Sequence, residues 1–201
     1  MRHRLQSRSR HRFGAAVALV IFLWPISLSG GLAWEALEQP GTVVIMRHAF
    51  APGSGDPEDF TLGDCETQRN LDERGRAQAR AIGAAFREHG VTVDRVLTSQ
   101  WCRAEETALL LGLAPVEEFP PLNSLFSDFG AWREQTEETR ALLYGLPADE
   151  RIVLVTHLFN VVALIGRLPS PGEVFVVDVA DNGSLEVLGE ILIHPESLTG
   201  L

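Results

Sequence analysis

Residues 41–48 read GTVVIMRH, an apolar run of β-branched residues that ends abruptly on an arginine and a histidine. Such a run, opened by a glycine, is typical of a strand that is buried on both faces of a sheet. Residues 95–99 (RVLTS) and 152–157 (IVLVTH) have the same character, and the second of these also ends on a histidine. The three runs predict the central strands of a sheet that is covered on both sides.

Amphipathic stretches separate and follow these strands. Their apolar spacing predicts helices over residues 72–89, 102–111, 131–144 and 160–167. Residues 174–179 and 185–193 flank the turn signal Asp-Asn-Gly and predict a hairpin. The alternation of strands and helices predicts an α/β fold, a three-layer sandwich with a mostly parallel central sheet and helices on both faces. The C-terminal hairpin should add an antiparallel edge.

Two connections and one glycine stand apart from this pattern. Residues 51–70 are rich in Gly, Pro and Asp and predict a long loop, a kind of segment that is usually functional or disordered. Residues 114–129 predict an irregular connection. Gly75, inside the first predicted helix, is expected to be an exposed weak point.

Composition and charge restrict the classes of function. The 201 residues are 45% hydrophobic and 22% charged, a globular mixture that excludes a disordered, collagenous or coiled-coil chain. All 17 basic residues are arginine, and without the five in residues 1–33 the remaining 12 face 27 acidic residues, a formal charge of −15. So acidic a domain is a poor general binder of nucleic acid or anionic membrane. An anion would have to bind in a local arginine pocket.

The N-terminus has the pattern of an export signal. Residues 1–12 are basic, residues 13–24 (FGAAVALVIFLW) are apolar, and small residues lead to a cleavage site after Ala33. This predicts a signal peptide over residues 1–33 and a folded domain over 34–201. The apolar run is shorter than the roughly 20 residues of a comfortable span, but an uncleaved membrane anchor remains the alternative. Either one places the domain in the periplasm or outside the cell.

The chain has two cysteines, Cys65 and Cys102. Export to an oxidising compartment favours a disulfide between them, and the alternative is a pair of buried free thiols. In the chain-entropy estimate, such a bridge contributes a few kcal/mol of stability.

Charged and imidazole side chains follow each of the three central strands. Arg47 and His48 end the first strand, His157 ends the third, and Arg103 lies in the first turn of the helix after the second. Because ligands bind at the carboxyl ends of the strands in such sheets, we expect these four residues at one rim. Guanidinium groups near helix N-termini form an anion site that suits phosphate.

Histidines in such a pocket suggest phosphoryl transfer. One imidazole, kept neutral by the neighbouring arginines, could attack phosphorus, and the other could donate a hydrogen bond to the transferring group. A zinc site built from His48, His157, Cys65 and Cys102 is the rival interpretation. The absence of short ligand spacings and the repulsion from two arginines argue against it, so we expect no metal.

Four segments, in order, resemble the motifs of the histidine phosphatase superfamily, which has the phosphoglycerate mutase-like fold. They are Met46-Arg47-His48-Ala49; Arg69-Asn70-Leu71 followed by Gly75-Arg76-Ala77-Gln78-Ala79; Thr98-Ser99-Gln100-Trp101-Cys102-Arg103-Ala104 with Thr107-Ala108; and Val155-Thr156-His157 with Asn160. Together they span roughly residues 42–179, and their order makes the resemblance specific.

This resemblance implies a cofactor-independent hydrolase of the phosphomonoesterase type. His48 would be the nucleophile and would form phosphohistidine, while Arg47, Arg103 and His157 would bind the phosphoryl group. The substrate would be a phosphate ester or phosphoramidate, carried by a phosphorylated small molecule or a phosphoprotein. Neither nucleic acid nor an organic cofactor is implied, and membrane contact would come only through an N-terminal anchor.

The sequence departs from the family pattern at two positions. Ala49 replaces a glycine, and Ser124 stands where the family has a glutamate that donates a proton to the leaving group. Serine is a poor general acid near neutral pH. Either Asp128 or a carboxylate of the long loop (Asp56, Glu58, Asp59 or Asp64) supplies the proton, or the leaving group needs little help. Phosphohistidine and acyl phosphates have such leaving groups, and mutase activity is disfavoured.

Arg69 is a further candidate for substrate binding. A Cys65–Cys102 bridge would bring it beside Arg103 at the rim, although a solvated loop position is the alternative. Two other functions stay open. The first is a non-catalytic phosphate-binding or anion-binding module, which the missing glutamate favours. The second is an envelope sugar-phosphate phosphatase, because periplasmic lipopolysaccharide-heptose phosphatases resemble this chain in carrying a signal and an Arg-His-Ala start.

Overall fold

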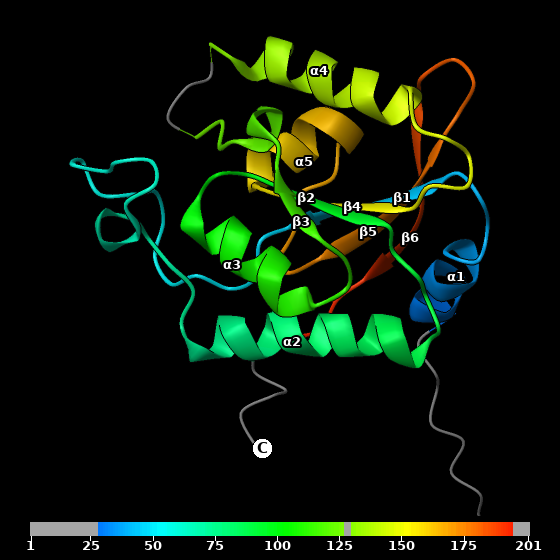
Figure 1. Cartoon of the computed structure of the whole chain (residues 1–201), viewed down its shortest axis with the longest axis horizontal. Helices are drawn as coiled ribbons and strands as arrows, with labels where there is room; N and C mark the ends of the chain where they lie inside the picture. Colours follow the sequence, from blue (N-terminus) through cyan, green and yellow to red (C-terminus); the bar gives the residue numbers. More distant parts are fainter. Residues whose placement is uncertain (1–27, 127–129, 195–201) are drawn as a thin grey trace, which may run out of the picture.

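A computed structural model describes residues 28–126 and 130–194. Six strands form one sheet in the order β3-β2-β4-β1-β5-β6. The pairs β2–β3, β2–β4 and β1–β4 are parallel, whereas β1–β5 and β5–β6 are antiparallel. The predicted α/β fold is therefore confirmed, including the antiparallel edge formed by the C-terminal hairpin (Figure 1).

The elements lie close to their predicted positions. The strands are β1 (Thr42–Arg47), β2 (Arg95–Thr98), β3 (Val116–Glu118), β4 (Ile152–Thr156), β5 (Val174–Val179) and β6 (Leu185–Ile191). The helices are α1 (Leu28–Ala36), α2 (Glu73–Glu88), α3 (Cys102–Leu111), α4 (Trp132–Tyr144) and α5 (Leu158–Ile165), with the short 3-10 turns η1 (Cys65–Thr67) and η2 (Pro120–Leu122). The expectation of an irregular stretch over 114–129 missed β3 and η2.

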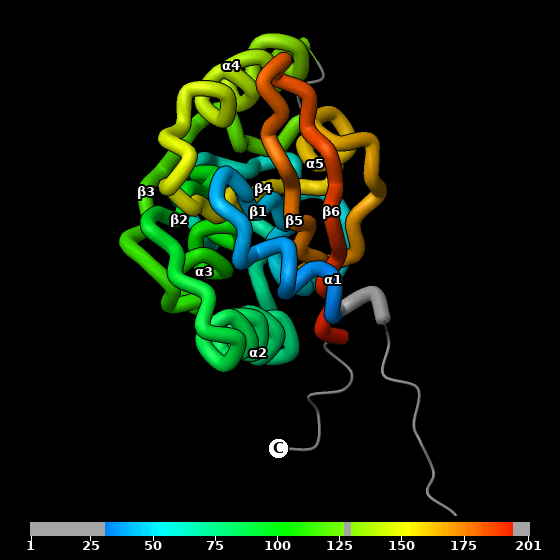
Figure 2. The backbone as a smooth tube through the Cα atoms, turned by 90° about the vertical axis from the view of Figure 1, so that its right-hand side faces the viewer, coloured from blue at the N-terminus to red at the C-terminus, as the bar shows by residue number. Residues whose placement is uncertain are grey.

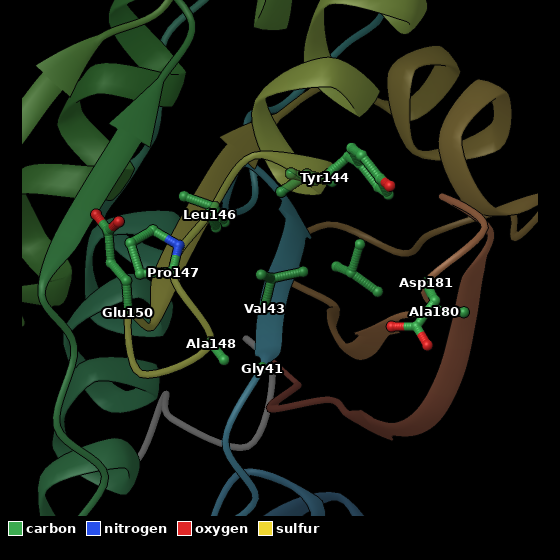
Figure 3. Close-up of a pocket in the computed structure, with 11 residues that line it drawn as sticks. Gly41, Val43, Tyr144, Leu146, Pro147, Ala148, Glu150, Ala180 and Asp181 are labelled. Atoms are coloured by element: carbon green, nitrogen blue, oxygen red, sulfur yellow. The ribbon is translucent and has the colours of Figure 1, made fainter.

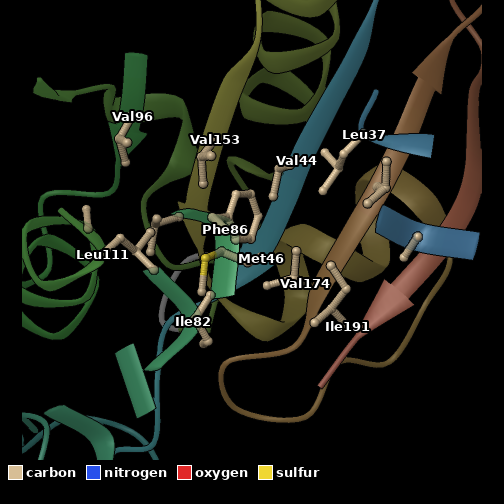
Figure 4. Close-up of a cluster of buried hydrophobic side chains, with 14 of the residues drawn as sticks. Leu37, Val44, Met46, Ile82, Phe86, Val96, Leu111, Val153, Val174 and Ile191 are labelled. Carbon is tan, nitrogen blue, oxygen red and sulfur yellow. The ribbon is translucent and has the colours of Figure 1, made fainter. Parts of the chain in front are cut away.

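Alternating residues of the strands build a core on each face of the sheet. On one face, Val44 and Met46 of β1 pack with side chains from α1, α2 and α3, including Phe86 (Figure 4). On the other face, Val43 and Ile45 pack with residues of η2, α4 and α5. This period of two, with both sets buried, explains the unbroken apolar run of the first strand. Figure 1 shows α4 above the sheet and α2 below it.

The helix α1 crosses the predicted boundary between residues 33 and 34. Residues 1–27, which contain most of the predicted signal or anchor, lie outside the described residues. Ala33 is fully buried, and a Cβ added at Gly189 of β6 would collide with it. The last part of the predicted leader therefore packs directly on the sheet edge, beside β6 (Figure 2). Within the described ranges, no helix is long and apolar enough to cross a bilayer.

Gly75 is not the exposed weak point that the sequence suggests. It is buried on the inner face of α2, and a Cβ at this position would collide with the carbonyl oxygen of Phe50. The glycine thus permits α2 to lie against the backbone that leaves β1. Asp72 caps this helix by accepting a hydrogen bond from the Gly75 amide at 3.0 Å.

Candidate active site

Strand order brings the four predicted residues to one rim of the sheet. His48 follows β1, His157 follows β4, and Arg103 lies in the first turn of α3, just after β2. Because β2, β4 and β1 are adjacent and parallel, their carboxyl ends meet at the same edge. The rings of the two histidines lie 5.3 Å apart between centroids. Arg47 and Arg69 line the same pocket.

The ring of His48 is oriented for nucleophilic attack through Nε2. Its Nδ1 lies 2.8 Å from the carbonyl oxygen of Ala49, which can only accept, so Nδ1 carries the proton. Nε2 accepts a hydrogen bond from Nε of Arg103 at 3.3 Å. Burial, followed by the charge of Arg103, holds the pKa of His48 well below its usual value. The ring is therefore neutral at physiological pH and keeps a lone pair on Nε2.

His157 fits the role of a hydrogen-bond donor to a bound anion. Its Nε2 lies 2.8 Å from the hydroxyl of Ser99, which also accepts from the amide of Trp101. Nδ1 is buried and has no hydrogen-bond partner among the described residues. The Ser99 hydroxyl can donate to Nε2, and that tautomer keeps the proton on Nδ1, where it is available to an anion. Burial, then the charges of His48 and Arg103, lowers the pKa of His157 well below its usual value.

Three arginines give the pocket its positive field. Arg47 donates from Nη1 to the carbonyl of Pro169 at 3.1 Å, and its buried Nε has no partner among the described residues. Arg69 donates to two loop carbonyls, at 2.8 and 2.7 Å. Burial and the charge of Arg103 lower the pKa of Arg69 to about 10, so it stays charged at neutral pH. A buried donor without a partner in such a field is suited to an anionic ligand.

Asp56 is the pocket residue that the sequence left least specified. The long loop carries it into the pocket, where both of its oxygens bind Arg103, with Oδ1–Nη1 and Oδ2–Nη2 distances of 2.7 and 3.2 Å. Trp101 and the backbone amide of Arg69 also donate to it. The Gly-Asp-Pro pattern of residues 55–57 marked a loop, but nothing in the pattern marked a contact with α3.

The other carboxylates considered as proton donors do not line this pocket among the described residues. Glu58, Asp59 and Asp64 are exposed, and Asp64 caps the turn η1. Asp128 lies outside the described residues. Ser124 lines the pocket, at the position where the family pattern has its glutamate, and accepts a hydrogen bond from the amide of Phe126 at 3.3 Å.

Residues of the remaining motifs hold the backbone that leaves β1. Thr107 of α3 accepts from the amide of Ala49 at 3.0 Å, and Gln78 of α2 accepts from the amide of Phe50 at 2.9 Å. Gln78 also donates to the carbonyl of Pro171 at 2.8 Å. These buried side chains fix the path of the chain next to His48, a role that the sequence pattern did not specify.

A disulfide joins the long loop to the start of α3. Cys65 and Cys102 are bonded, with their Cα atoms 5.7 Å apart. The bond links the loop that carries Arg69 to the helix that carries Arg103, and Nη1 of Arg103 donates to the carbonyl of Arg69 at 3.3 Å, so the two arginines are neighbours at the pocket. Because both sulfurs are used in this bond, the rival zinc site has no thiolate ligands. Among the described residues, no group of three or more His, Cys, Asp or Glu side chains has a metal-binding arrangement.

A second pocket lies at the opposite end of β1 (Figure 3). Gly41 and Val43 line it together with Tyr144, Glu150 and Asp181. It contains neither an arginine nor a histidine, and its two carboxylates would repel an anion. This second pocket therefore lacks the arginines and histidines that the sequence analysis places in a phosphate site.

The fold and the pocket define a class of α/β proteins with paired histidines and arginines at the carboxyl edge of a mostly parallel sheet. The model of the histidine phosphatase superfamily (branch 1) matches residues 43–151, and the chain belongs to this superfamily. The predicted family is thus confirmed over more than half of the chain.

Individual relatives are more distant. The mitochondrial serine/threonine-protein phosphatase Pgam5 of Drosophila grimshawi is 35% identical over 66 residues, which is 33% of this chain but only 20% of that protein. The structure of the protein histidine phosphatase SixA complexed with tungstate has a TM-score of 0.55 at 23% identity, covering 78% of this chain and 99% of that one. A putative phosphohistidine phosphatase SixA from Nakamurella multipartitia has the same TM-score at 24% identity, over 77% and 95% of the two chains. These two likenesses concern the fold.

Proposed function

We propose that this protein is a phosphatase that hydrolyses a phosphate ester or phosphoramidate through a phosphohistidine formed on His48. The observation that carries the proposal is the state of this ring. It is buried and neutral, its Nδ1 proton is held by the Ala49 carbonyl, and its Nε2 faces Arg103. Membership of the histidine phosphatase superfamily supports the same role.

In the first step, Nε2 of His48 attacks phosphorus and forms an N–P bond. The bond between phosphorus and the leaving oxygen or nitrogen breaks, and its electron pair goes to the leaving atom. In the second step, water attacks the phosphorus and the N–P electron pair returns to Nε2. Inorganic phosphate departs with the oxygen of the water, and the proton released by the water neutralises the leaving group through solvent. The protein recovers its initial state without a cofactor.

The surrounding charges would stabilise the transferring group. Phosphoryl transfer depends mainly on positioning and on groups that neutralise charge spread over the equatorial oxygens. Arg47 and His157 each hold a buried nitrogen that has no partner among the described residues, and both line the pocket. We assign these nitrogens, together with the Arg103 side chain, to the phosphoryl oxygens. Arg69, on the loop side, would bind a more distant part of the same anion.

Replacement of His48 by asparagine tests the proposal. We expect the variant to lose turnover of 4-nitrophenyl phosphate by at least about 10³-fold, because the nucleophile is removed while the pocket keeps its volume. His89→Gln is the matched control, since His89 is exposed at the end of α2 and stacks on Trp34. Wild-type turnover by the asparagine variant would contradict the assignment. Phosphate binding by a wild-type protein that never turns over an ester would favour the anion-binding module, which the serine at position 124 motivates.

We also infer that the domain works outside the cytoplasm. The disulfide between the two cysteines supports this location, because such bonds persist in oxidising compartments. Fractionation of the native host, with thiol counting under denaturing and non-reducing conditions, checks the inference. Release with the periplasmic or external fraction and no titratable thiol is expected, whereas cytoplasmic protein with two free thiols would refute it. A panel of phosphorylated sugars, small molecules and peptides would then identify the substrate.

A further inference from the structure

Asp56 is surrounded by hydrogen-bond donors alone. Oδ1 accepts from Nη1 of Arg103 at 2.7 Å and from the amide of Arg69 at 3.2 Å. Oδ2 accepts from Nη2 of Arg103 at 3.2 Å and from Nε1 of Trp101 at 3.0 Å. A protonated carboxyl would need an acceptor for its own O–H, but four N–H groups occupy its coordination sites. The side chain is 15% exposed, so little room remains for a water to serve as that acceptor.

We propose that Asp56 is an ionised positioning residue that holds Arg103 for phosphate, and that it does not donate a proton to the leaving group. This inference rests on the phosphatase function proposed above. It also bears on the substrate class. Asp56 is the one carboxylate among the described residues that line the pocket, so if it stays ionised no lining carboxyl can give the leaving group a proton.

The geometry of Arg103 explains what the contact achieves. Asp56 takes up the end of the guanidinium that carries Nη1 and Nη2, in a bidentate fork. The Nε edge is thereby turned toward His48, 3.3 Å from its Nε2. A phosphoryl group that approaches Nε2 of His48 therefore meets the Nε–H of Arg103 already in place. Without Asp56, the guanidinium could rotate away from this edge, and positioning would be lost.

The charge of Asp56 also sets the net charge of the pocket lining. Arg47, Arg69 and Arg103 contribute three positive charges among the described lining residues, and Asp56 contributes one negative charge. The remaining two positive charges match the dianion of a phosphate monoester. Burial by itself raises the pKa of Asp56, but the hydrogen bonds and charge of Arg103 outweigh it and lower the pKa below its usual value.

A pocket whose carboxylate stays ionised favours substrates with good leaving groups. The leaving atom must depart with the electron pair of its broken bond and take its proton from solvent, or carry that proton before the reaction. Aryl phosphates, acyl phosphates and ring-protonated phosphoramidates satisfy this condition, whereas simple alkyl phosphates do not. The substrate class is therefore set on the leaving-group side by the lack of a protonated carboxyl among the described lining residues, and on the phosphoryl side by the arginines.

A series of aryl phosphates with phenols of graded acidity tests both parts. We expect kcat/KM of the wild-type protein to fall steeply as the leaving phenol becomes less acidic. Asp56→Asn should lower kcat/KM by roughly 10- to 100-fold for every ester and leave the slope unchanged, because it loses a charge-assisted contact and no proton donor. Asp59→Asn is the matched control on the same loop, since Asp59 is exposed and away from the pocket. It should behave as wild type.

A second variant separates positioning from loss of the fold. In Asp56→Gly, added formate should restore part of the activity, because it supplies a carboxylate at the vacated position. Absence of rescue, or wild-type activity of Asp56→Asn, would overturn the positioning role. A shallow wild-type slope that becomes steep in Asp56→Asn would make Asp56 the general acid and overturn the inference while leaving the phosphatase function intact. Inactivity of the wild-type protein toward every ester would instead overturn the proposed function, and this inference with it.

Discussion

The pocket has two halves that are built in different ways. The sheet half carries His48 and His157 at the ends of adjacent parallel strands, where backbone ladders fix their separation. The loop half carries Asp56 and Arg69. A disulfide ties this loop to α3, Arg69 donates to two loop carbonyls, and Asp56 accepts from Arg103, Trp101 and the amide of Arg69. Arg103 hydrogen-bonds to both halves, with His48 on one side and Asp56 on the other, and Trp101 also contacts both, through Asp56 and the ring of His157. Positions set by strand pairing follow from local sequence, whereas positions set by tertiary contacts do not.

Among the changes that affect the link between the two halves, loss of Arg103 should have the largest effect, because it removes the hydrogen bonds that join His48 to Asp56. Arg103→Met removes the donor nearest to His48 and leaves Asp56 as a buried charge without its cation. We expect kcat/KM to fall by roughly 10²- to 10³-fold and the free energy of unfolding to fall by about 3 kcal/mol. Steady-state kinetics and urea denaturation measure the two losses.

The double variant Arg103→Met with Asp56→Asn is the control for this prediction. It should regain stability relative to the single variant, because no uncompensated charge remains, yet its kcat/KM should stay as low as that of the single variant. Recovery of activity in the double variant would mean that Arg103 serves only to neutralise Asp56.

Removal of the disulfide should loosen the positions of the loop-half residues and leave the sheet half in place. In Cys65→Ser with Cys102→Ser, a cross-link over a sequence separation of 37 is lost, which in the chain-entropy estimate costs about 2–4 kcal/mol of unfolding free energy. Because the histidines are held by the sheet, we expect KM to rise more than kcat falls. Thermal denaturation and steady-state kinetics below the new transition check this. A fall in kcat with unchanged KM would place the disulfide's effect on the sheet half.

Gly75→Ala should disturb the packing of α2 against the backbone that follows His48 in the sheet half. The new Cβ would meet the Phe50 carbonyl, so α2 must move away from the backbone next to His48. We expect a loss of about 1–3 kcal/mol in unfolding free energy. Gly145→Ala is the control, because a Cβ at that position, just after α4, meets the Ala141 and Leu142 carbonyls only at the ordinary contact distances of 3.4 and 3.6 Å. Chemical denaturation of both variants should separate them, and equal stabilities would contradict the close approach.

The smallest expected effect is the change in the stability of the folded protein with pH. Burial, with the neighbouring positive charges, lowers the pKa values of His48 and His157 in the folded protein. Below about pH 6.5 the unfolded chain therefore binds more protons than the folded one, and stability falls as the pH falls, by at most about 1.4 kcal/mol per pH unit for each histidine. His48→Asn should make this dependence shallower. Melting temperatures between about pH 5 and 7.5 report the slope, and a protein that gains stability on acidification would contradict the burial of neutral rings.

The sequence predicted the sheet half because strand ends are local signals. Runs of buried β-branched residues gave β1, β2 and β4 within about a residue, and parallel pairing then required their carboxyl ends to meet. The short edge strand β3 was missed because Val116–Glu118 has one apolar residue and owes its conformation to pairing with β2. Gly75 was misjudged for a related reason, since its burial depends on backbone from a distant segment.

The loop half was only partly accessible from the sequence. The cysteine count predicted a cross-link, and the structure contains the bond. Arg69 could equally have been a solvated loop residue, and Asp56 was one of several interchangeable acids. Their positions depend on hydrogen bonds to Trp101, Arg103 and loop carbonyls, and irregular segments have no periodicity that announces such contacts.

Trapping of the phosphorylated protein tests the central chemical step most directly. The wild-type protein is mixed briefly with an aryl phosphate, quenched in alkali and mapped by mass spectrometry, with His48→Asn beside it. We predict one phosphoryl group, labile to acid and stable to alkali, on His48, and none in the variant. A phosphoryl group on another residue, or steady turnover with no phosphorylated histidine at any time, would contradict the account.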